Sequence, residues 1–339
     1  MKTYRIVECL GDGISAELSQ SVHRIAEALP FRVEFQQVDL SVESRREHGA
    51  AIYDEAVDAM TTLRSAIKYP TVTDHESPNR VLRERCDFAV IHRPVMTFPG
   101  VENNFKQSLD IDVVRIATGG TYSDRGMRIG EESAVSIRVI ERRPSRLAAR
   151  YAFDLAREKN ANVVSTSKFT IQRAADGLFE QHVEEIAKHY PEIEYRRELF
   201  DALLAGVILR PQNYRVIVTP NEYGDFLSDM ACGLIGSIGL GDSASFAFDE
   251  AGGCTLAMFD PAGGSAPDIA GQGICNPSAA LLAFGSLLRH IGQRATGQAV
   301  RDAVRDAIGA GEKTRDIGGD LDTKSFTEAV VARLALAPA

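Results

Sequence analysis

Two carboxylates at helical spacing are the first residues that suggest chemistry. Asp225 and Asp229 are four positions apart, and the stretch 226–236 has the pattern of a helix, so both carboxylates are predicted to share one face near its start. Two such groups repel each other unless a cation lies between them, and oxygen ligands suit Mg²⁺ or Mn²⁺. A solvated acidic face is the alternative interpretation of this pair.

Arginines form the second candidate group, and they recur in one part of the chain: Arg80, Arg83, Arg93 and Arg115. A guanidinium matches a carboxylate through two parallel hydrogen bonds. Several of them in an acidic chain suggest a pocket for a di- or tricarboxylate. The alternative is a set of surface ion pairs with Glu84 and Asp87.

A glycine-rich segment at 260–271 is a candidate nucleotide loop. Its glycines allow the backbone to approach a phosphate or an adenine closely. The carboxylate of Asp268 could accept a hydrogen bond from a ribose 2′-hydroxyl and would repel a 2′-phosphate, which favours NAD over NADP. No GxGxxG sequence stands between a strand and a helix, so the usual dinucleotide fingerprint is missing and an ordinary surface loop is the alternative.

Tyr122 follows the pair Gly119-Gly120 and is a candidate proton donor, provided that a nearby cation lowers its pKa. Lys168, at the end of a predicted strand, could be that cation. A tyrosine at the edge of the core and a lysine on the surface are the alternative.

The elements that must position these residues alternate between short apolar runs and amphipathic stretches. Strands are predicted at 4–10, 31–38, 65–69, 88–92, 113–117, 163–167 and 216–218. Helices are predicted at 16–29, 51–63, 144–159, 181–189, 278–291 and 298–309. This rhythm predicts an α/β protein with a largely parallel or mixed sheet.

Composition excludes several classes of function. The 339 residues carry 38 Lys and Arg against 47 Asp and Glu, a formal charge of −9, which disfavours nucleic acid and anionic membranes as partners. No apolar run approaches the ~18 residues of a membrane span, and the first residues lack the features of a signal peptide. The five cysteines are scattered without a CxxC pair, so we expect free thiols and a cytoplasmic protein.

Together these motifs resemble, in order and over nearly the whole chain, the β-decarboxylating dehydrogenases that act on isocitrate, 3-isopropylmalate, homoisocitrate or tartrate. The matching segments are Gly11-Asp12-Gly13-Ile14, Leu82-Arg83, Arg93-Pro94, Arg115, Thr118–Tyr122, Thr219–Asn221, Gly224–Asp229, Gly264–Gly271 and Asn276-Pro277. The segments 224–229 and 264–271 are the most specific.

The resemblance implies a fold and a set of roles. The fold would be the two-domain α/β fold of this family, which is not a Rossmann fold, with mixed sheets flanked by helices. Residues 1–88 plus 236–339 would form the cofactor-side domain, and the inserted residues 89–235 would bind substrate and form a homodimer. Implied substrate ligands are Arg83, Arg93 and Arg115, and implied ligands of Mg²⁺ or Mn²⁺ are Asp201, Asp225 and Asp229.

Catalysis would be shared between subunits in such a dimer. Asp201 and Lys168 would reach the site from a second subunit, where Lys168 helps to remove the hydroxyl proton, and Tyr122 would protonate the enol after CO₂ leaves. NAD would be the cofactor, with these candidate contacts: Thr71, Gly264, Ser265, Ala266, Asp268, Ile269 and Asn276.

The segment Ser77-Pro78-Asn79-Arg80 offers polar groups where relatives that take 3-isopropylmalate place apolar ones. It therefore predicts a polar or anionic C3 substituent, as in homoisocitrate or 3-phosphonomethylmalate. Departures from the family pattern at Gly263, Gln272 and Thr170 leave two alternatives: a non-catalytic regulatory subunit, or a dehydrogenase of 3-isopropylmalate or tartrate.

Overall fold

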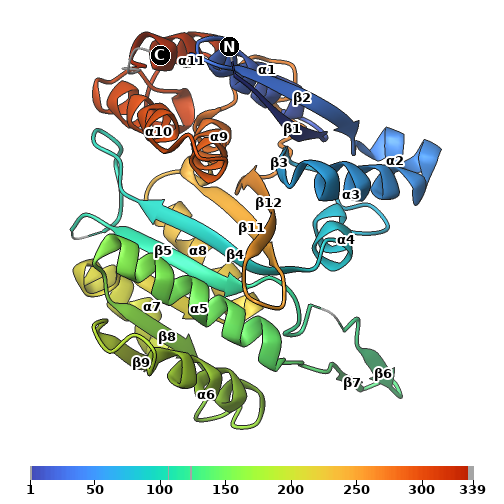
Figure 1. Ribbon diagram of the computed structural model, residues 1–339, viewed down its shortest axis with the longest axis vertical. Helices are drawn as coiled ribbons and strands as arrows, with labels where there is room; N and C mark the ends of the chain where they lie inside the picture. The colour runs from blue at the N-terminus through green and yellow to red at the C-terminus, as the bar shows by residue number, and fades with distance from the viewer. Residues whose placement is uncertain (1, 106, 123, 335–339) are drawn as a thin grey trace.

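Ten strands form one continuous mixed sheet in the computed structural model, which describes residues 2–105, 107–122 and 124–334 (Figure 1). The strand order is β2-β1-β3-β12-β11-β4-β5-β10-β8-β9, and a separate hairpin pairs β6 with β7. Strand β11 pairs antiparallel with both β12 and β4, and β4 pairs antiparallel with β5, whereas the pairs toward the two edges are parallel. The α/β class and the mixed sheet flanked by helices are thus confirmed.

The strands are β1 (Thr3–Leu10), β2 (Arg32–Asp39), β3 (Ser65–Lys68), β4 (Phe88–Met96), β5 (Asp110–Ile116), β6 (Met127–Ile129), β7 (Ser133–Val135), β8 (Val163–Ser167), β9 (Tyr195–Leu199), β10 (Val216–Thr219), β11 (Asp242–Phe248) and β12 (Cys254–Pro261). The helices are α1 (Ser15–Glu27), α2 (Val42–His48), α3 (Ala51–Leu63), α4 (Pro78–Arg85), α5 (Arg142–Lys159), α6 (Ala175–Ala187), α7 (Phe200–Leu209), α8 (Asn221–Leu234), α9 (Ser278–His290), α10 (Arg294–Gly309) and α11 (Thr323–Ala332).

Helices cover both faces of the sheet, so its inner strands are apolar on both sides. In β1, Ile6 belongs to the core on the side of α1, whereas Val7 belongs to the cluster that includes Tyr53 and Met60 of α3. Neighbouring residues of a strand face opposite sides, which is why a short continuous apolar run, rather than an alternating one, marks a strand buried in this way.

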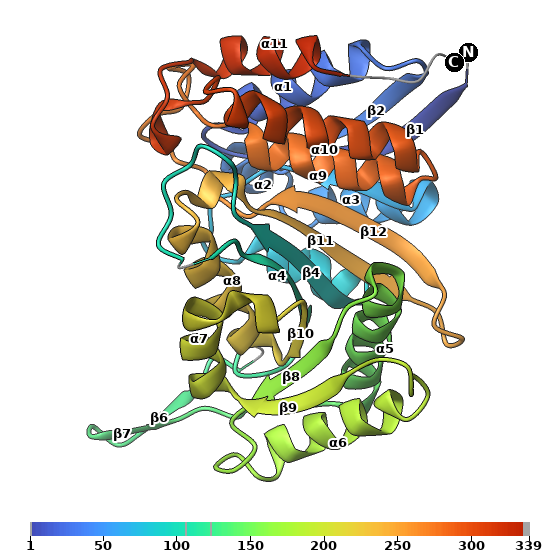
Figure 2. The same cartoon turned by 90° about the vertical axis from the view of Figure 1, so that its left-hand side faces the viewer.

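Successive side chains of β4 likewise face different helices on the two sides of the sheet. Arg93 donates to Ser228 and Asp229 of α8, whereas the next residue back, His92, contacts Tyr151 of α5 on the opposite face. The candidate chemistry therefore belongs to the face covered by α8 and α4, and α5 covers the reverse face (Figure 2).

The candidate nucleotide loop, the glycine-rich segment 260–271, belongs to a longer segment, 233–273, that is rich in glycine. The longer segment contains β11 and β12, joined by a turn, and the loop proper spans only 262–277, between β12 and α9. The predicted domain boundaries at 88/89 and 235/236 fall at the start of β4 and just after α8, and the division into these two domains stays a proposal.

The hairpin β6–β7 projects from the body of the protein (Figures 1 and 2). It exposes apolar side chains, among them Met127 at 66% and Ile129 at 56%. Within the described residues, no helix combines the length and apolarity needed to cross a bilayer. All five cysteines are free thiols, as expected.

Candidate active site

The two carboxylates of the first motif lie on α8, which begins earlier than predicted. The helix starts at Asn221, directly after Pro220, so Asp225 stands in its second turn rather than at its start. The expected start at 226 was wrong because Asn221 and Glu222, though polar, are buried and helical. The spacing argument still holds, since Arg93 Nη1 contacts both Asp225 (3.2 Å) and Asp229 (2.7 Å).

Three arginines converge on this pair of carboxylates from three elements. Arg93 comes from β4 and Arg115 from β5, where Arg115 contacts Asp225 and donates to Asn221 Oδ1 at 2.9 Å. Arg83, on α4, lies close enough for its charge to act on both Arg93 and Asp225. The Nε atom of each of these three guanidiniums is buried and has no hydrogen-bond partner among the described residues.

Crowding among these cations affects the pKa values of Arg115 and Arg83. Burial, together with the charges of Arg93 and Arg83, lowers the pKa of Arg115 to about 9. Burial likewise lowers the pKa of Arg83, and Arg93 adds to the effect. Burial alone would raise the pKa of the Asp225 carboxyl, but Arg115 and Arg93 hold it below its usual value. The cluster is therefore a candidate site for an anion.

Surface ion pairing explains only one of the four predicted arginines. Arg80 Nε lies 3.8 Å from Glu84 one helical turn away, whereas Asp87 pairs with Arg143 of α5 and not with the arginine cluster. The alternative interpretation, in which the arginines form surface ion pairs with Glu84 and Asp87, is thus wrong for Arg83, Arg93 and Arg115.

The residues predicted to face the C3 substituent form the start of α4. Ser77 is the N-cap, and its Oγ accepts the backbone N–H of Arg80, with Pro78 in the first helical turn. Asn79 carries a buried Oδ1 with no hydrogen-bond partner among the described residues. The hydroxyl oxygen of Ser77 is therefore already used as a cap, while the amide oxygen of Asn79 still lacks a donor.

Tyr122 contacts a carboxylate rather than a cation. Its hydroxyl donates to Asp225 Oδ2 at 3.0 Å, after a turn in which Gly119 and Gly120 both have positive φ angles. Burial and the negative charge of Asp225 raise the pKa of Tyr122 to about 12. The expected lowering of this pKa by Lys168 is wrong for a single copy of the chain, because Lys168 lies elsewhere.

Lys168 and Asp201 form a pair of their own. Lys168 Nζ donates to Asp201 Oδ1 at 2.7 Å, and this contact lowers the pKa of the Asp201 carboxyl. Across residues 2–105, 107–122 and 124–334, no three His, Cys, Asp or Glu side chains form a group that could hold a metal ion. One copy of the chain therefore does not bring Asp201 together with Asp225 and Asp229.

A buried network that the sequence did not reveal supports both halves of the site. Arg138 Nε donates to Glu222 Oε1 at 2.6 Å, and its Nη1 contacts Asp176. Asp176 in turn accepts the backbone N–H of Lys168 at 2.8 Å and the hydroxyl of Tyr223 at 3.2 Å. The network ties the segment after β7 to the start of α8 and to the loop that carries Lys168.

Lys68, which is buried, and Asp260 are polar residues near the arginine cluster. The side chain of Lys68 lies inside the core, and burial lowers its pKa to about 8. Its ammonium donates to the hydroxyl of Thr71 at 3.1 Å, and it lies near Asp260, whose Oδ1 has no hydrogen-bond partner among the described residues. A charged residue inside the apolar strand 65–69 was the one signal in the sequence that could have identified it.

The predicted cofactor residues other than Thr71 lie in the loop 262–277. Ser265 O accepts the backbone N–H of Ile14 at 2.9 Å, and Ala266 has a φ of +39°, which is strained for a residue with a Cβ. Asn276 donates to Asp316 Oδ2 at 3.0 Å, and its Oδ1 accepts the backbone N–H of Ser278, the first residue of α9, at 2.9 Å. The exposed carboxylate of Asp268 has no hydrogen bond to a described residue, so it is available to a ligand.

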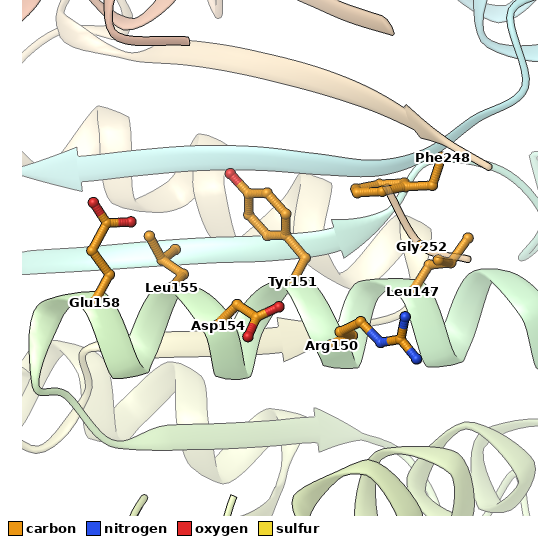
Figure 3. A pocket seen from close by; sticks show the side chains of 8 residues that line it. All are labelled: Leu147, Arg150, Tyr151, Asp154, Leu155, Glu158, Phe248 and Gly252. Atoms are coloured by element: carbon orange, nitrogen blue, oxygen red, sulfur yellow. The ribbon is translucent and has the colours of Figure 1, made fainter. Parts of the chain in front are cut away.

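The hollows on the reverse face belong to other parts of the fold. One, of about 170 Å³, lies between α5 and the β11–β12 hairpin and includes Tyr151 and Phe248 (Figure 3). It adjoins a larger one of about 650 Å³ that extends toward α9 and α10. None of the predicted site residues lines either hollow, so we place the candidate site on the face of α8.

Comparison with known proteins gives one consistent result. The profile of the isocitrate/isopropylmalate dehydrogenase family matches residues 3–330. The 3-isopropylmalate dehydrogenase of Archaeoglobus fulgidus is 36% identical, over 97% of this chain and 99% of the relative. The isocitrate/homoisocitrate dehydrogenase of Thermus thermophilus is 33% identical, over 98% of each chain.

Two further similar proteins are named for isocitrate alone. Subunit 2 of the mitochondrial NAD isocitrate dehydrogenase of Saccharomyces cerevisiae is 36% identical, over 96% of this chain and 88% of the relative. The crystal structure of the isocitrate dehydrogenase from Methylococcus capsulatus superposes with a TM-score of 0.90 at 32% identity, covering 98% of this chain and 100% of that one. Identity is similar for all of these relatives, so it does not choose among isocitrate, homoisocitrate and 3-isopropylmalate.

Proposed function

Because the chain belongs to the isocitrate/isopropylmalate dehydrogenase family, we propose that it oxidises and decarboxylates a 3-substituted malate with NAD and Mg²⁺ or Mn²⁺. The observation that carries this proposal is the cluster of Arg83, Arg93 and Arg115, buried beside Asp225 with an unpaired Nε on each guanidinium. A polycarboxylate would satisfy these donors and relieve the repulsion among the cations.

The carboxylates of α8 suit a hard divalent cation, and they would supply part of its ligands. Asp225 and Asp229 offer carboxylate oxygens on one helix face, and each is held by Arg93. We propose that Asp201 of a second copy supplies a further ligand. It is exposed, lies in the first turn of α7, and in one copy contacts only Lys168 among the described side chains.

Exposed apolar side chains support this homodimer. Phe226, next to Asp225, is 57% exposed, and Leu209 of α7 is 50% exposed. With the hairpin β6–β7, they place apolar surface beside both halves of the divided site, as expected for a face that a second copy covers.

The residues of this chain then divide the proton transfers between them. When bound, the metal would polarise the 2-oxygen of the substrate, and NAD would accept the hydride from C2. Lys168 of the second copy takes the hydroxyl proton. Tyr122, whose pKa of about 12 keeps it protonated at neutral pH, delivers a proton to C3 once CO₂ has left.

We infer the substrate substituent from Arg80 and Asn79, and the cofactor from Asp268. Arg80, whose Nε lies 3.8 Å from Glu84, supports an anionic group at C3, such as a longer carboxylate or a phosphonate. The Oδ1 of Asn79, which has no partner among the described residues, supports a polar group that donates a hydrogen bond. The available carboxylate of Asp268 supports NAD over NADP, because it would repel a 2′-phosphate.

An activity screen tests the proposal. The purified protein is assayed with Mn²⁺ and either NAD or NADP on isocitrate, homoisocitrate, 3-phosphonomethylmalate, 3-isopropylmalate and tartrate, and both NADH and CO₂ are measured. We expect NAD-dependent CO₂ release that Arg115→Lys abolishes, because a lysine cannot reproduce the fork-shaped contacts. The control, Arg143→Lys, changes an exposed arginine that pairs with Asp87 and should keep full activity.

Each part of the proposal can fail separately in this screen. Absence of turnover with every acid would favour the regulatory subunit. A preference for 3-isopropylmalate would contradict the polar substituent, equal turnover with NADP would contradict the assignment of Asp268, and oxidation without CO₂ would contradict decarboxylation.

A further inference from the structure

The loop 262–277 is held at one point by a carboxylate from outside it. Glu17, in the first turn of α1, accepts two backbone N–H groups from the loop: that of Gly273 on Oε1 at 2.7 Å and that of Gly271 on Oε2 at 3.0 Å. Both glycines have a positive φ, +74° for Gly271 and +68° for Gly273. These backbone groups are consequently bonded to the protein itself and do not cradle a phosphate.

The residues just before Glu17 contact the other end of the same loop. Ile14 N donates to Ser265 O at 2.9 Å. Gly13 approaches so closely that a Cβ at this position would lie 1.8 Å from Ser265 O. The segment 13–17 thus contacts the loop on both sides of Asp268, the residue proposed to meet the ribose.

The same turn also orders the segment that carries Thr71. Asp12 accepts the backbone N–H of Val72 at 2.7 Å and that of Val42 at 2.8 Å, and Asp12 N donates to Pro70 O at 2.8 Å. Both segments assigned to the cofactor are therefore fixed to one short stretch of chain.

We propose that Glu17 is a positioning residue that shapes the loop 262–277 for the adenosine half of NAD, an inference that rests on the proposed function. A carboxylate that accepts two backbone N–H groups makes two charge-assisted bonds. Without it, the segment between Asp268 and Gly273, with two glycines free in φ, gains conformations, and the cofactor must order them on binding. Removing the carboxylate of Glu17 should therefore weaken the binding of NAD and leave the binding of the acid unchanged, because Glu17 does not contact the arginine cluster or Tyr122.

The test compares Glu17→Gln with a matched control, a glutamate of α11 that also contacts α1. A glutamine has the shape of the glutamate, but it replaces one carboxylate oxygen with an NH₂ group. This group cannot accept a backbone N–H, so one of the two hydrogen bonds is lost. The control is Glu328→Gln, which breaks the contacts of Glu328 with Arg24 of α1 (2.7 and 2.9 Å) and leaves the loop untouched.

Three readouts distinguish positioning from general stability. We expect Glu17→Gln to raise the dissociation constant of NAD, measured by calorimetry, and the KM for NAD by about tenfold, with kcat at saturating NAD and the KM for the acid within twofold of wild type. We also expect faster hydrogen exchange at the amides of Gly271 and Gly273 in the protein without ligand. The control should match wild type in all of these.

The outcomes separate this inference from the function on which it rests. A wild-type protein that does not bind NAD overturns both. A wild-type protein that binds NAD, with an unchanged dissociation constant in Glu17→Gln, overturns only the positioning role. A fall in melting temperature with equal changes in both KM values also overturns it, because it assigns Glu17 a structural role alone.

Discussion

Glu180 offers a quantitative test of the reasoning about burial and charge. It lies on α6 with no exposed surface, and its carboxyl group accepts the hydroxyls of Ser165 and Ser167, each at 2.5 Å. Burial raises its pKa from an ordinary 4.5 to about 7, and the two serine hydroxyls only partly oppose the rise. Since Ser167 directly precedes Lys168, this carboxyl group supports the strand that presents the candidate base.

The sign and size of the effect follow from the two pKa values. Between pH 4.5 and about 7 the native protein keeps a proton on Glu180 that the unfolded chain has released, so stability falls as the pH rises through this window. At roughly 1.4 kcal/mol for each pH unit, the loss is at most about 3 kcal/mol above pH 7. Glu180→Gln, which is never charged, avoids this loss.

Urea unfolding at several pH values measures the difference. At a fixed protein concentration, we expect Glu180→Gln to be more stable than wild type by about 2–3 kcal/mol at pH 8.5, with the gain shrinking toward pH 5. The control, Glu184→Gln, alters an exposed residue of the same helix that pairs with Arg197 at 2.9 Å, and should change stability by under about 0.5 kcal/mol at every pH. A Glu180→Gln protein that is equally destabilised at pH 5 and pH 8.5 would refute the argument.

Three further substitutions test other parts of the site and fold. Tyr122→Phe should lower the rate of decarboxylation by about 10² or more with little change in the KM of the acid, and an unchanged rate of CO₂ release would exclude Tyr122 as the proton donor. Asp112→Asn should lower the free energy of unfolding by about 3 kcal/mol at pH 7, measured with urea, because it leaves the ammonium of Lys159 beside a buried amide. The difference from wild type should vanish only in acid, below the depressed pKa of Asp112, where the wild-type carboxylate is protonated as well. Gly13→Ala should lower stability by about 2 kcal/mol and weaken NAD binding, since its Cβ would collide with Ser265 O; a neutral substitution would show that the loop shifts freely.

Most elements with strong periodicity were predictable, and the failures have physical causes. The apolar run of β8 and the amphipathic pattern of α3 match the structure to the residue. Strand β11 was missed because its sequence, Asp-Ser-Ala-Ser-Phe-Ala-Phe, is rich in small residues with weak strand preference; pairing with β4 and β12 determines it. Helix α4 was not among the predicted helices, because the segment Ser77–Arg83 was interpreted only for its polar groups, although Ser77 and Pro78 cap and begin the helix.

The kinds of residue in the site were predictable, but their partners were not. The sequence suggested a pocket for carboxylates lined by arginines, and three of these arginines do lie together, but the anion they would bind stays a proposal. The sequence also assigned Tyr122 to Lys168, whereas its neighbour is Asp225. Arg138 was not found at all. Its partners Glu222 and Asp176 lie 84 and 38 residues away, and no local spacing encodes a network assembled by three separate segments.

The contacts of the loop 262–277 also constrain the order in which the protein can be completed. Glu17 and Gly271 are 254 residues apart, and β3 finds its partner β12 only after most of the chain has been synthesised. A ribosome-bound chain that ends before β12 has the turn at 11–13 but lacks the loop 262–277, whose Ser265 accepts the backbone N–H of Ile14. Because such distant contacts close slowly, the half of the molecule that would receive the dinucleotide should be the last to mature, and a nascent chain can acquire its arginine cluster before it can hold a cofactor.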